Sequence, residues 1–146
     1  MSADTSFTPR LNHVAMTMAP ESLDERGRAE IKDFFGDVFG WSEGDNSGES
    51  GNPLIMMTGE FMQFVYLLPG DPALACPTLD HFGLQVSSVE EIETIVGKAK
   101  TWQAKDDRVK IIDIKARDTD HYVLTSAYIG FLLPMMVELQ HLAVHP

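Results

Sequence analysis

The sequence predicts an α+β fold in which two βαβββ modules pair into an open, curved mixed sheet, with helices outside and a barrel-like cavity within. A repeat carries this prediction. Residues 11–18, LNHVAMTM, and residues 79–86, LDHFGLQV, read as one strand written twice, with a histidine at the same point. A helical stretch and about three strand candidates follow each copy. Because one such module cannot cover both faces of its sheet, we expect the two to pack together.

The chain length fits a single domain. A chain of 146 residues can bury a substantial core. We therefore expect one domain over residues 1–146, with the first module at about 8–68 and the second at about 79–144. The segment 69–78, which is rich in proline, is expected to link them.

The first module should contain one helix and a hairpin after its first strand. Within residues 21–41, apolar side chains recur at i, i+3, i+4, i+7 and i+8, at Ile31, Phe34, Phe35, Val38 and Phe39. Gly40 stands where a helix is expected to end. Residues 42–53 are rich in Gly, Ser and Asn and predict a mobile loop. LIMM and EFMQFVYLL then predict two strands that turn near Gly59.

The second module repeats this order. Ser88 followed by Glu91 is a capping-box pattern, which predicts that a helix begins there. Its buried stripe is expected at Ile92, Ile95, Val96 and Ala99. The stretches VKIIDIKA, HYVLTSAYIGFLL and MMVELQHL predict three further strands.

Composition bounds the partners and the compartment. The formal net charge of −11 disfavours nucleic acid and anionic membranes as partners, so we expect neither. Cys76 is the only cysteine, and no signal-peptide pattern opens the chain. No window approaches the length of a transmembrane span. We expect a cytoplasmic protein that acts on a small molecule.

The two repeated histidines should point away from the helices. Side chains alternate along a strand, so Val14 and Phe82 belong to the helix-packed faces and the histidines to the opposite faces. Very small residues, Ala15 and Gly83, share the faces of His13 and His81 respectively. Small neighbours leave space around an imidazole, whereas a histidine that only fills a core is expected to have bulky neighbours.

Each module also places one polar residue in a late apolar strand. Gln63 stands in the first module and Glu138 in the second, at places that the repeat makes equivalent. Isolating a carboxylate in an apolar strand costs several kcal/mol unless a cation or strong donors meet it. The repeat therefore predicts four inward polar side chains: His13, Gln63, His81 and Glu138.

Two imidazoles, an amide oxygen and a carboxylate are suitable ligands for a divalent transition metal such as Ni, Co, Mn, Zn or Fe. One negative charge among the ligands leaves a strong Lewis acid. The competing interpretation is that each histidine is a hydrogen-bonded core or rim residue, and that Gln63 only orients a substrate. His121 is expected in a turn, and His141 on the face opposite Glu138. The methionines are expected to fill the core.

These residues resemble the landmarks of the vicinal oxygen chelate superfamily, which contains glyoxalases, bleomycin-resistance proteins and extradiol dioxygenases. LNHVAMTM, DFFGDVFGW, LDHFGLQV and MMVELQ occur in the family's order and span nearly the whole chain. The resemblance implies paired βαβββ modules around one divalent metal, commonly in a homodimer. It places the metal ligands at His13, Gln63, His81 and Glu138, similar to the methylmalonyl-CoA epimerase branch.

The resemblance implies a metal-dependent isomerase, epimerase or lyase that stabilises an enolate or the vicinal oxygens of a small substrate. Glu138 could also act as the catalytic base if it leaves the metal. Two alternatives remain open: an extradiol-type dioxygenase using His13, His81 and Glu138, or a metal-free binding protein like those of bleomycin resistance. Leu133-Pro134-Met135-Met136 replaces a polar turn common in the family, and this apolar segment predicts burial.

Overall fold

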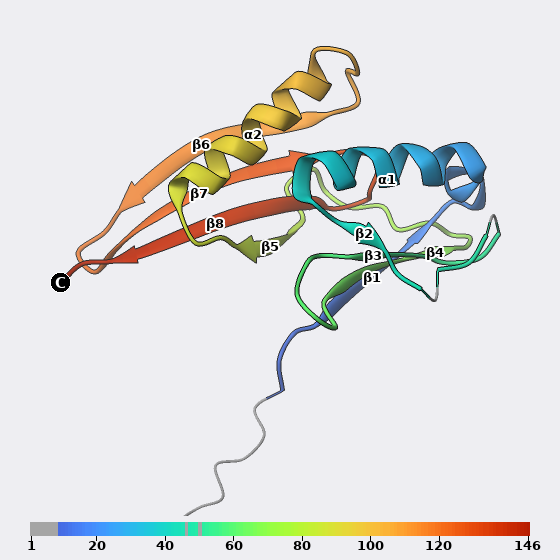
Figure 1. Ribbon diagram of the computed structural model, residues 1–146, viewed down its shortest axis with the longest axis horizontal. Coiled ribbons are helices and arrows are strands. Elements are labelled where there is room, and N and C mark those ends of the chain that lie inside the picture. Colours follow the sequence, from blue (N-terminus) through green and yellow to red (C-terminus); the bar gives the residue numbers. More distant parts are fainter. Residues whose placement is uncertain (1–8, 46, 50) are drawn as a thin grey trace, which may run out of the picture.

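The computed structural model describes residues 9–45, 47–49 and 51–146 (Figure 1). The predicted order of elements is confirmed in both modules. The elements of the first are β1 (His13–Met18), the 3₁₀ helix η1 (Pro20–Leu23), α1 (Glu25–Phe39), β2 (Ser42–Glu43), β3 (Leu54–Met57) and β4 (Phe64–Pro69). Those of the second are β5 (His81–Gln85), α2 (Val89–Gln103), β6 (Lys110–Asp118), β7 (Tyr122–Gly130) and β8 (Met136–Val144).

Each module forms its own four-stranded mixed sheet. The strand orders are β1-β4-β3-β2 and β5-β8-β7-β6. In both modules the first strand pairs in parallel with the last, and the other pairings are antiparallel. The predicted α+β fold with two βαβββ modules is confirmed, and the two sheets are not closed into a barrel. β1 and β5 each end their sheet, so each leaves one edge without a strand partner among the described residues.

Both helices lie on one side of the sheets (Figure 1). The side chains beneath them form one core that includes Met16, Val65, Val137 and Leu139. We call the opposite surface of each sheet its open face. His13, Ala15, His81 and Gly83 stand on the open faces, as alternation predicts, because their strand neighbours pack into the core.

The ends of α1 follow from its sequence. The carboxylate of Asp24 accepts a hydrogen bond from the backbone N–H of Gly27 at 2.7 Å and caps the N-terminus. Gly40 ends the helix with φ of 73°, a left-handed conformation that glycine adopts without strain. The predicted stripe is confirmed, since Ile31, Phe34, Phe35 and Val38 are buried and Phe39 packs against the core.

The predicted cap of α2 forms with one difference. Ser88 Oγ accepts a hydrogen bond from the backbone N–H of Glu91 at 3.2 Å. The carboxylate of Glu91 accepts from the backbone N–H of Ser87, one residue before the cap, at 2.8 Å. Two N–H groups at the start of the helix thus have side-chain partners.

The segment predicted as a mobile loop, 42–53, begins with the short strand β2 and is held to α1. Arg28, a residue only 5% exposed, donates through its guanidinium to the carbonyl oxygens of Gly48, Asn52 (2.7 Å) and Pro53 (3.0 Å). Residues 46 and 50 of this loop lie outside the described residues, as do residues 1–8, where the predicted domain and first module begin. In the described part of the chain, no helix combines the length and apolarity needed to cross a bilayer.

Candidate metal centre

One pair of predicted ligands meets on the open face of the second sheet. Nε2 of His81 in β5 lies 3.2 Å from Oε2 of Glu138 in β8. Gly83 stands directly opposite Glu138 in the parallel ladder, and a β-carbon built on Gly83 would lie 3.5 Å from the same oxygen. The small residue noted beside the histidine in the sequence therefore leaves room for the carboxylate.

The orientation of the His81 ring is fixed by the backbone. Its Nδ1 donates a hydrogen bond to the carbonyl oxygen of Leu79 at 2.7 Å. Because a carbonyl oxygen can only accept, Nδ1 carries the proton, and in the neutral ring Nε2 presents a lone pair toward Glu138. Metal-binding histidines in proteins are commonly oriented in this way.

Glu138 is buried, with 5% of the residue exposed. Tyr128 of β7 stands opposite it in the antiparallel ladder, and the Tyr128 ring meets the His81 ring edge-on at a centroid distance of 4.9 Å. The pKa of Tyr128 is raised above its ordinary value of 10.0. Burial of the phenol is the largest cause, and the hydrogen bond to Glu138 and the negative charge of Glu138 are the next two. Sequence reasoning missed this phenol, although its spacing of ten residues before Glu138 follows directly from a hairpin register.

His13 has a similar arrangement in the first module. Its Nδ1 lies 2.7 Å from the amide oxygen of Asn12, which can only accept, so Nδ1 is again the protonated nitrogen. The ring stacks on Phe64 at a centroid distance of 4.8 Å, and the residue is exposed. Nε2 is thereby left as the nitrogen available to a ligand in both modules.

The strand register separates Gln63 from Glu138. His81 pairs with Met136, and Glu138 lies two residues further along the same strand. His13 pairs with Phe64, so the equivalent position in the first module is Tyr66, opposite Ala15. The predicted equivalence of Gln63 and Glu138 is wrong for this reason. A ligand role for Gln63 stays a prediction, since its exposed side chain lines a pocket close to His13.

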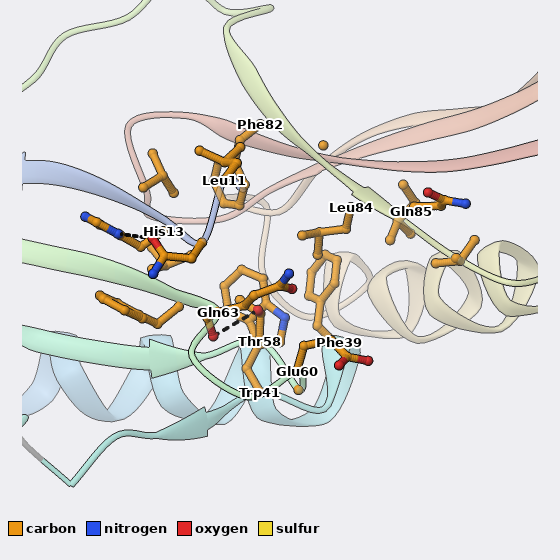
Figure 2. Close-up of a pocket in the computed structure, with 18 of the residues that line it drawn as sticks. Leu11, His13, Phe39, Trp41, Thr58, Glu60, Gln63, Phe82, Leu84 and Gln85 are labelled. Atoms are coloured by element: carbon orange, nitrogen blue, oxygen red, sulfur yellow. Dashed lines mark hydrogen bonds between the residues drawn. The ribbon is translucent and has the colours of Figure 1, made fainter. Parts of the chain in front are cut away.

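A pocket of about 620 Å³ lies between β1, the edge strand of the first sheet, and β5, the edge strand of the second (Figure 2). His13 and Gln63 line it from the first module, and Phe82, Gly83 and Gln85 from the second. Within the described ranges, one chain contains no cluster of three or more His, Cys, Asp or Glu side chains that could hold a metal. A single chain thus brings His81 and Glu138 together but does not add His13.

The atoms of the His81–Glu138 pair fit a metal. Two ligand atoms at right angles around a divalent ion, each about 2.1 Å from it, lie about 3.0 Å apart. The observed 3.2 Å separation is close to that value. An imidazole nitrogen and a carboxylate oxygen suit the metals considered, and the Leu79 carbonyl and Tyr128 supply orienting contacts around them.

No family model and no curated protein sequence matches this chain. Solved structures do match it across nearly its full length. A mutant of the fosfomycin resistance protein FosX from Listeria monocytogenes, complexed with Mn(II) and 1S,2S-dihydroxypropylphosphonic acid, superposes with a TM-score of 0.61 at 18% identity, covering 91% of this chain and 92% of that one.

Two further structures are similar to the same extent. Lactoylglutathione lyase from Agrobacterium tumefaciens gives a TM-score of 0.61 at 16% identity, with 91% of this chain and 93% of that one covered. A putative glyoxalase family protein from Bacillus anthracis gives 0.60 at 14%, covering 92% and 96%. Because these identities are below 20%, the comparisons establish the fold alone: this chain folds as FosX, lactoylglutathione lyase and the glyoxalase family protein do, and this is the fold that the sequence resemblance implied.

Proposed function

We propose that this protein is a metal-dependent enzyme that binds two neighbouring oxygens of a small substrate, and that it belongs to the isomerase, epimerase or lyase class. The observation that carries the proposal is the 3.2 Å approach of His81 Nε2 to Glu138 Oε2. A divalent metal held there supplies a Lewis acid that stabilises negative charge on substrate oxygens. Two structures of the same fold support this choice by analogy: the FosX mutant was crystallised with Mn(II), and the protein from Agrobacterium tumefaciens is a lactoylglutathione lyase.

We further propose that the complete site forms between two copies of the chain. His13 completes a set of three ligands only when the β1 edge of one copy lies beside the β5 edge of the other. Both edges leave backbone groups without strand partners, and Leu11 and Leu79 beside them are 85% and 65% exposed. Edge pairing would cover these leucines and align the two repeated histidines, which stand at matching points of their strands.

In such a site Tyr128 would act as a hydrogen-bond donor and Glu138 as a proton acceptor. The phenol keeps its proton to a higher pH than an ordinary tyrosine, because burial and the Glu138 charge oppose ionisation. It can therefore donate a hydrogen bond to a substrate oxygen. Glu138 could accept a substrate proton if it releases the metal, which is the base role expected from the sequence.

A ring-cleaving dioxygenase is the second candidate. The register that places Tyr66 opposite Ala15 leaves His13, His81 and Glu138 as a set of two histidines and one carboxylate. Such sets, with open positions opposite them, are typical of non-haem Fe(II) oxygenases. Anaerobic loading with Fe(II), followed by catechols and oxygen, tests this alternative directly.

Metal analysis tests the leading proposal. Protein purified without chelators and then titrated with Mn, Ni, Co or Zn should bind about one ion per chain. His81→Ala and Glu138→Ala should each weaken this binding strongly, whereas His141→Ala should not, because His141 faces away from Glu138. Unchanged metal affinity in the first two variants would remove the proposal and favour a metal-free binding protein.

A mixing experiment tests the shared site. His13→Ala and Glu138→Ala homodimers should each lack complete sites. Random exchange of subunits makes half of the dimers mixed, and each mixed dimer regains one intact site, so about a quarter of the wild-type metal binding should return. Recovery does not occur if all ligands come from one chain, because every chain in the mixture carries a defect.

A further inference from the structure

The open face of the second sheet carries an organised set of side chains beyond His81, Glu138 and Tyr128. The register places Gly83, Glu138, Tyr128 and Ile112 in one row across the four strands. The next row is formed by Gln85, Gln140, Ser126 and Lys115. All four members of this second row are polar, and they run from β5, beside the pocket, to β6 at the far edge.

A β-bulge determines which side chains of β6 share this face. Ile112 pairs with Tyr128, but after a register shift Lys115 pairs with Ser126 and Arg117 with Leu124. Without the shift, Ile114 and Ala116 would occupy those places. Asp113 instead turns toward α2, where it binds Lys100 at 2.6 Å, and Ile114 packs against the core. The bulge thus places Lys115 and Arg117 on the same face of the sheet as Glu138. Bulges beside functional sites often redirect side chains in this way.

The charge on this face is opposite to that of the whole chain. The chain has 22 acidic and 11 basic residues. Among the paired strand residues that share the open face with Glu138, the cations are Lys110, Lys115 and Arg117, and Glu138 is the one carboxylate. Lys110 donates to the carbonyl oxygen of Asp107 at 2.7 Å. Lys115 and Arg117 are exposed at register positions on this face, and a local positive field in an acidic protein attracts anionic ligands.

We propose that Lys115 and Arg117 bind an anionic group, a carboxylate or a phosphate, at the far end of an elongated substrate. Gln85, Gln140 and Ser126 would hydrogen-bond to hydroxyl or amide groups between the two ends. Adjacent strands lie about 4.8 Å apart and alternate residues about 6.8 Å apart, so the Cα atoms of Lys115 and Glu138 are separated by about 12 Å. This inference rests on the proposed function, because it assumes that the two-oxygen head of the substrate lies at His81 and Glu138.

Three synthetic chelators test the proposal by calorimetric titration of the Mn-loaded protein. Acetohydroxamate presents only the two-oxygen head. The monohydroxamate of octanedioic acid adds a carboxylate on a long chain, and its primary amide is the uncharged match. The wild type should bind the carboxylate probe roughly tenfold more tightly than the amide at low salt, and the preference should shrink as salt is added.

The variant Lys115→Ala/Arg117→Ala should lose this preference and bind the two long probes within about twofold of each other. Lys105→Ala is the matched control, because it removes an exposed cation just beyond α2, outside the open face, and should keep the wild-type ratio. Lys115→Glu should reverse the preference in favour of the amide. Circular dichroism confirms that each variant is folded. A phosphonate-tailed probe that binds more tightly than the carboxylate would identify a phosphate group as the natural anion.

The outcomes separate the two proposals. If acetohydroxamate binds only to the metal-loaded protein but the wild type does not distinguish carboxylate from amide, the anion subsite is wrong and the metal site stands. The same conclusion follows if the preference persists in Lys115→Ala/Arg117→Ala. If acetohydroxamate shows no metal-dependent binding, the proposed function fails and this inference fails with it.

Discussion

Trp102 of α2 donates an indole N–H hydrogen bond to Oδ2 of Asp37 in α1 at 2.7 Å, and this bond joins the two modules through their helices. The Trp102 ring also meets Phe34 and Phe131, at centroid distances of 5.4 and 6.4 Å. Arg108 adds an ion pair of 3.0 Å to Glu30 across the same boundary. The helix layer thus holds the modules together, while no backbone ladder joins the two sheets within residues 9–45, 47–49 and 51–146.

The hydrogen bond between the two helices predicts that substitutions of Trp102 and Asp37 have non-additive effects on the free energy of unfolding. Asp37→Ala should lower the free energy of unfolding by about 1 kcal/mol because it removes the hydrogen bond, and Trp102→Phe should cost more because it also removes part of the packed ring. The double variant should cost little more than Trp102→Phe alone in urea denaturation, because both substitutions remove the same hydrogen bond. Trp102→Ala should cost about 3 kcal/mol, since it also empties the space beside Phe34. Fully additive costs in the double variant would contradict the contact.

Arg28 gives a second stability prediction. Its buried guanidinium serves three backbone carbonyls of the 48–53 segment, and the single ammonium of a lysine cannot span them. Arg28→Lys should therefore cost about 2 kcal/mol of unfolding free energy. Arg26→Lys, in an exposed ion pair with Glu30, should change it by less than about 0.5 kcal/mol. Equal effects of the two substitutions would show that the loop is not held by Arg28.

Gly83 should control the metal site through space alone. A β-carbon there is in ordinary contact with Glu138, so Gly83→Ala should keep metal affinity within about threefold. The branched side chain of Gly83→Val would push against the carboxylate and should weaken metal binding by more than roughly tenfold, with the fold retained. Metal titration followed by thermal melting separates the two effects. Wild-type affinity in Gly83→Val would mean that Glu138 binds no metal at this place.

Tyr128 predicts a dependence on alkaline pH. Its pKa is raised in the folded state, so its contribution to stability is complete below pH 10.0, the ordinary pKa, and is lost as pH rises through the folded-state pKa. In a tyrosinate absorbance titration, the step that Tyr128→Phe removes should lie above 10.0. Glu138→Gln should move this step downward but leave it raised, because burial remains the larger cause. A Tyr128 step at or below 10.0 in the wild type would contradict the contact with Glu138.

Local patterns predicted the elements well because each depends on neighbouring residues. The apolar stripe and Gly40 defined α1, and Ser88 defined the start of α2. Alternation placed His13 and His81 on the faces away from the helices. The prediction that Gln63 is equivalent to Glu138 is wrong because counting residues within an apolar run cannot locate the first residue of the strand. β4 begins at Phe64, after a turn in which Met62 adopts a positive φ.

The sequence by itself determined the two-module architecture and the faces of its strands, because strand alternation and helix periodicity are set by bonds along the chain. Only the tertiary structure decided which side chains meet. Parallel pairing of β5 with β8 joins His81 to Glu138, antiparallel pairing adds Tyr128, and a bulge of one residue directs Lys115 to the same face. Each of these contacts depends on the register between two strands, which the alternation within a single strand does not set.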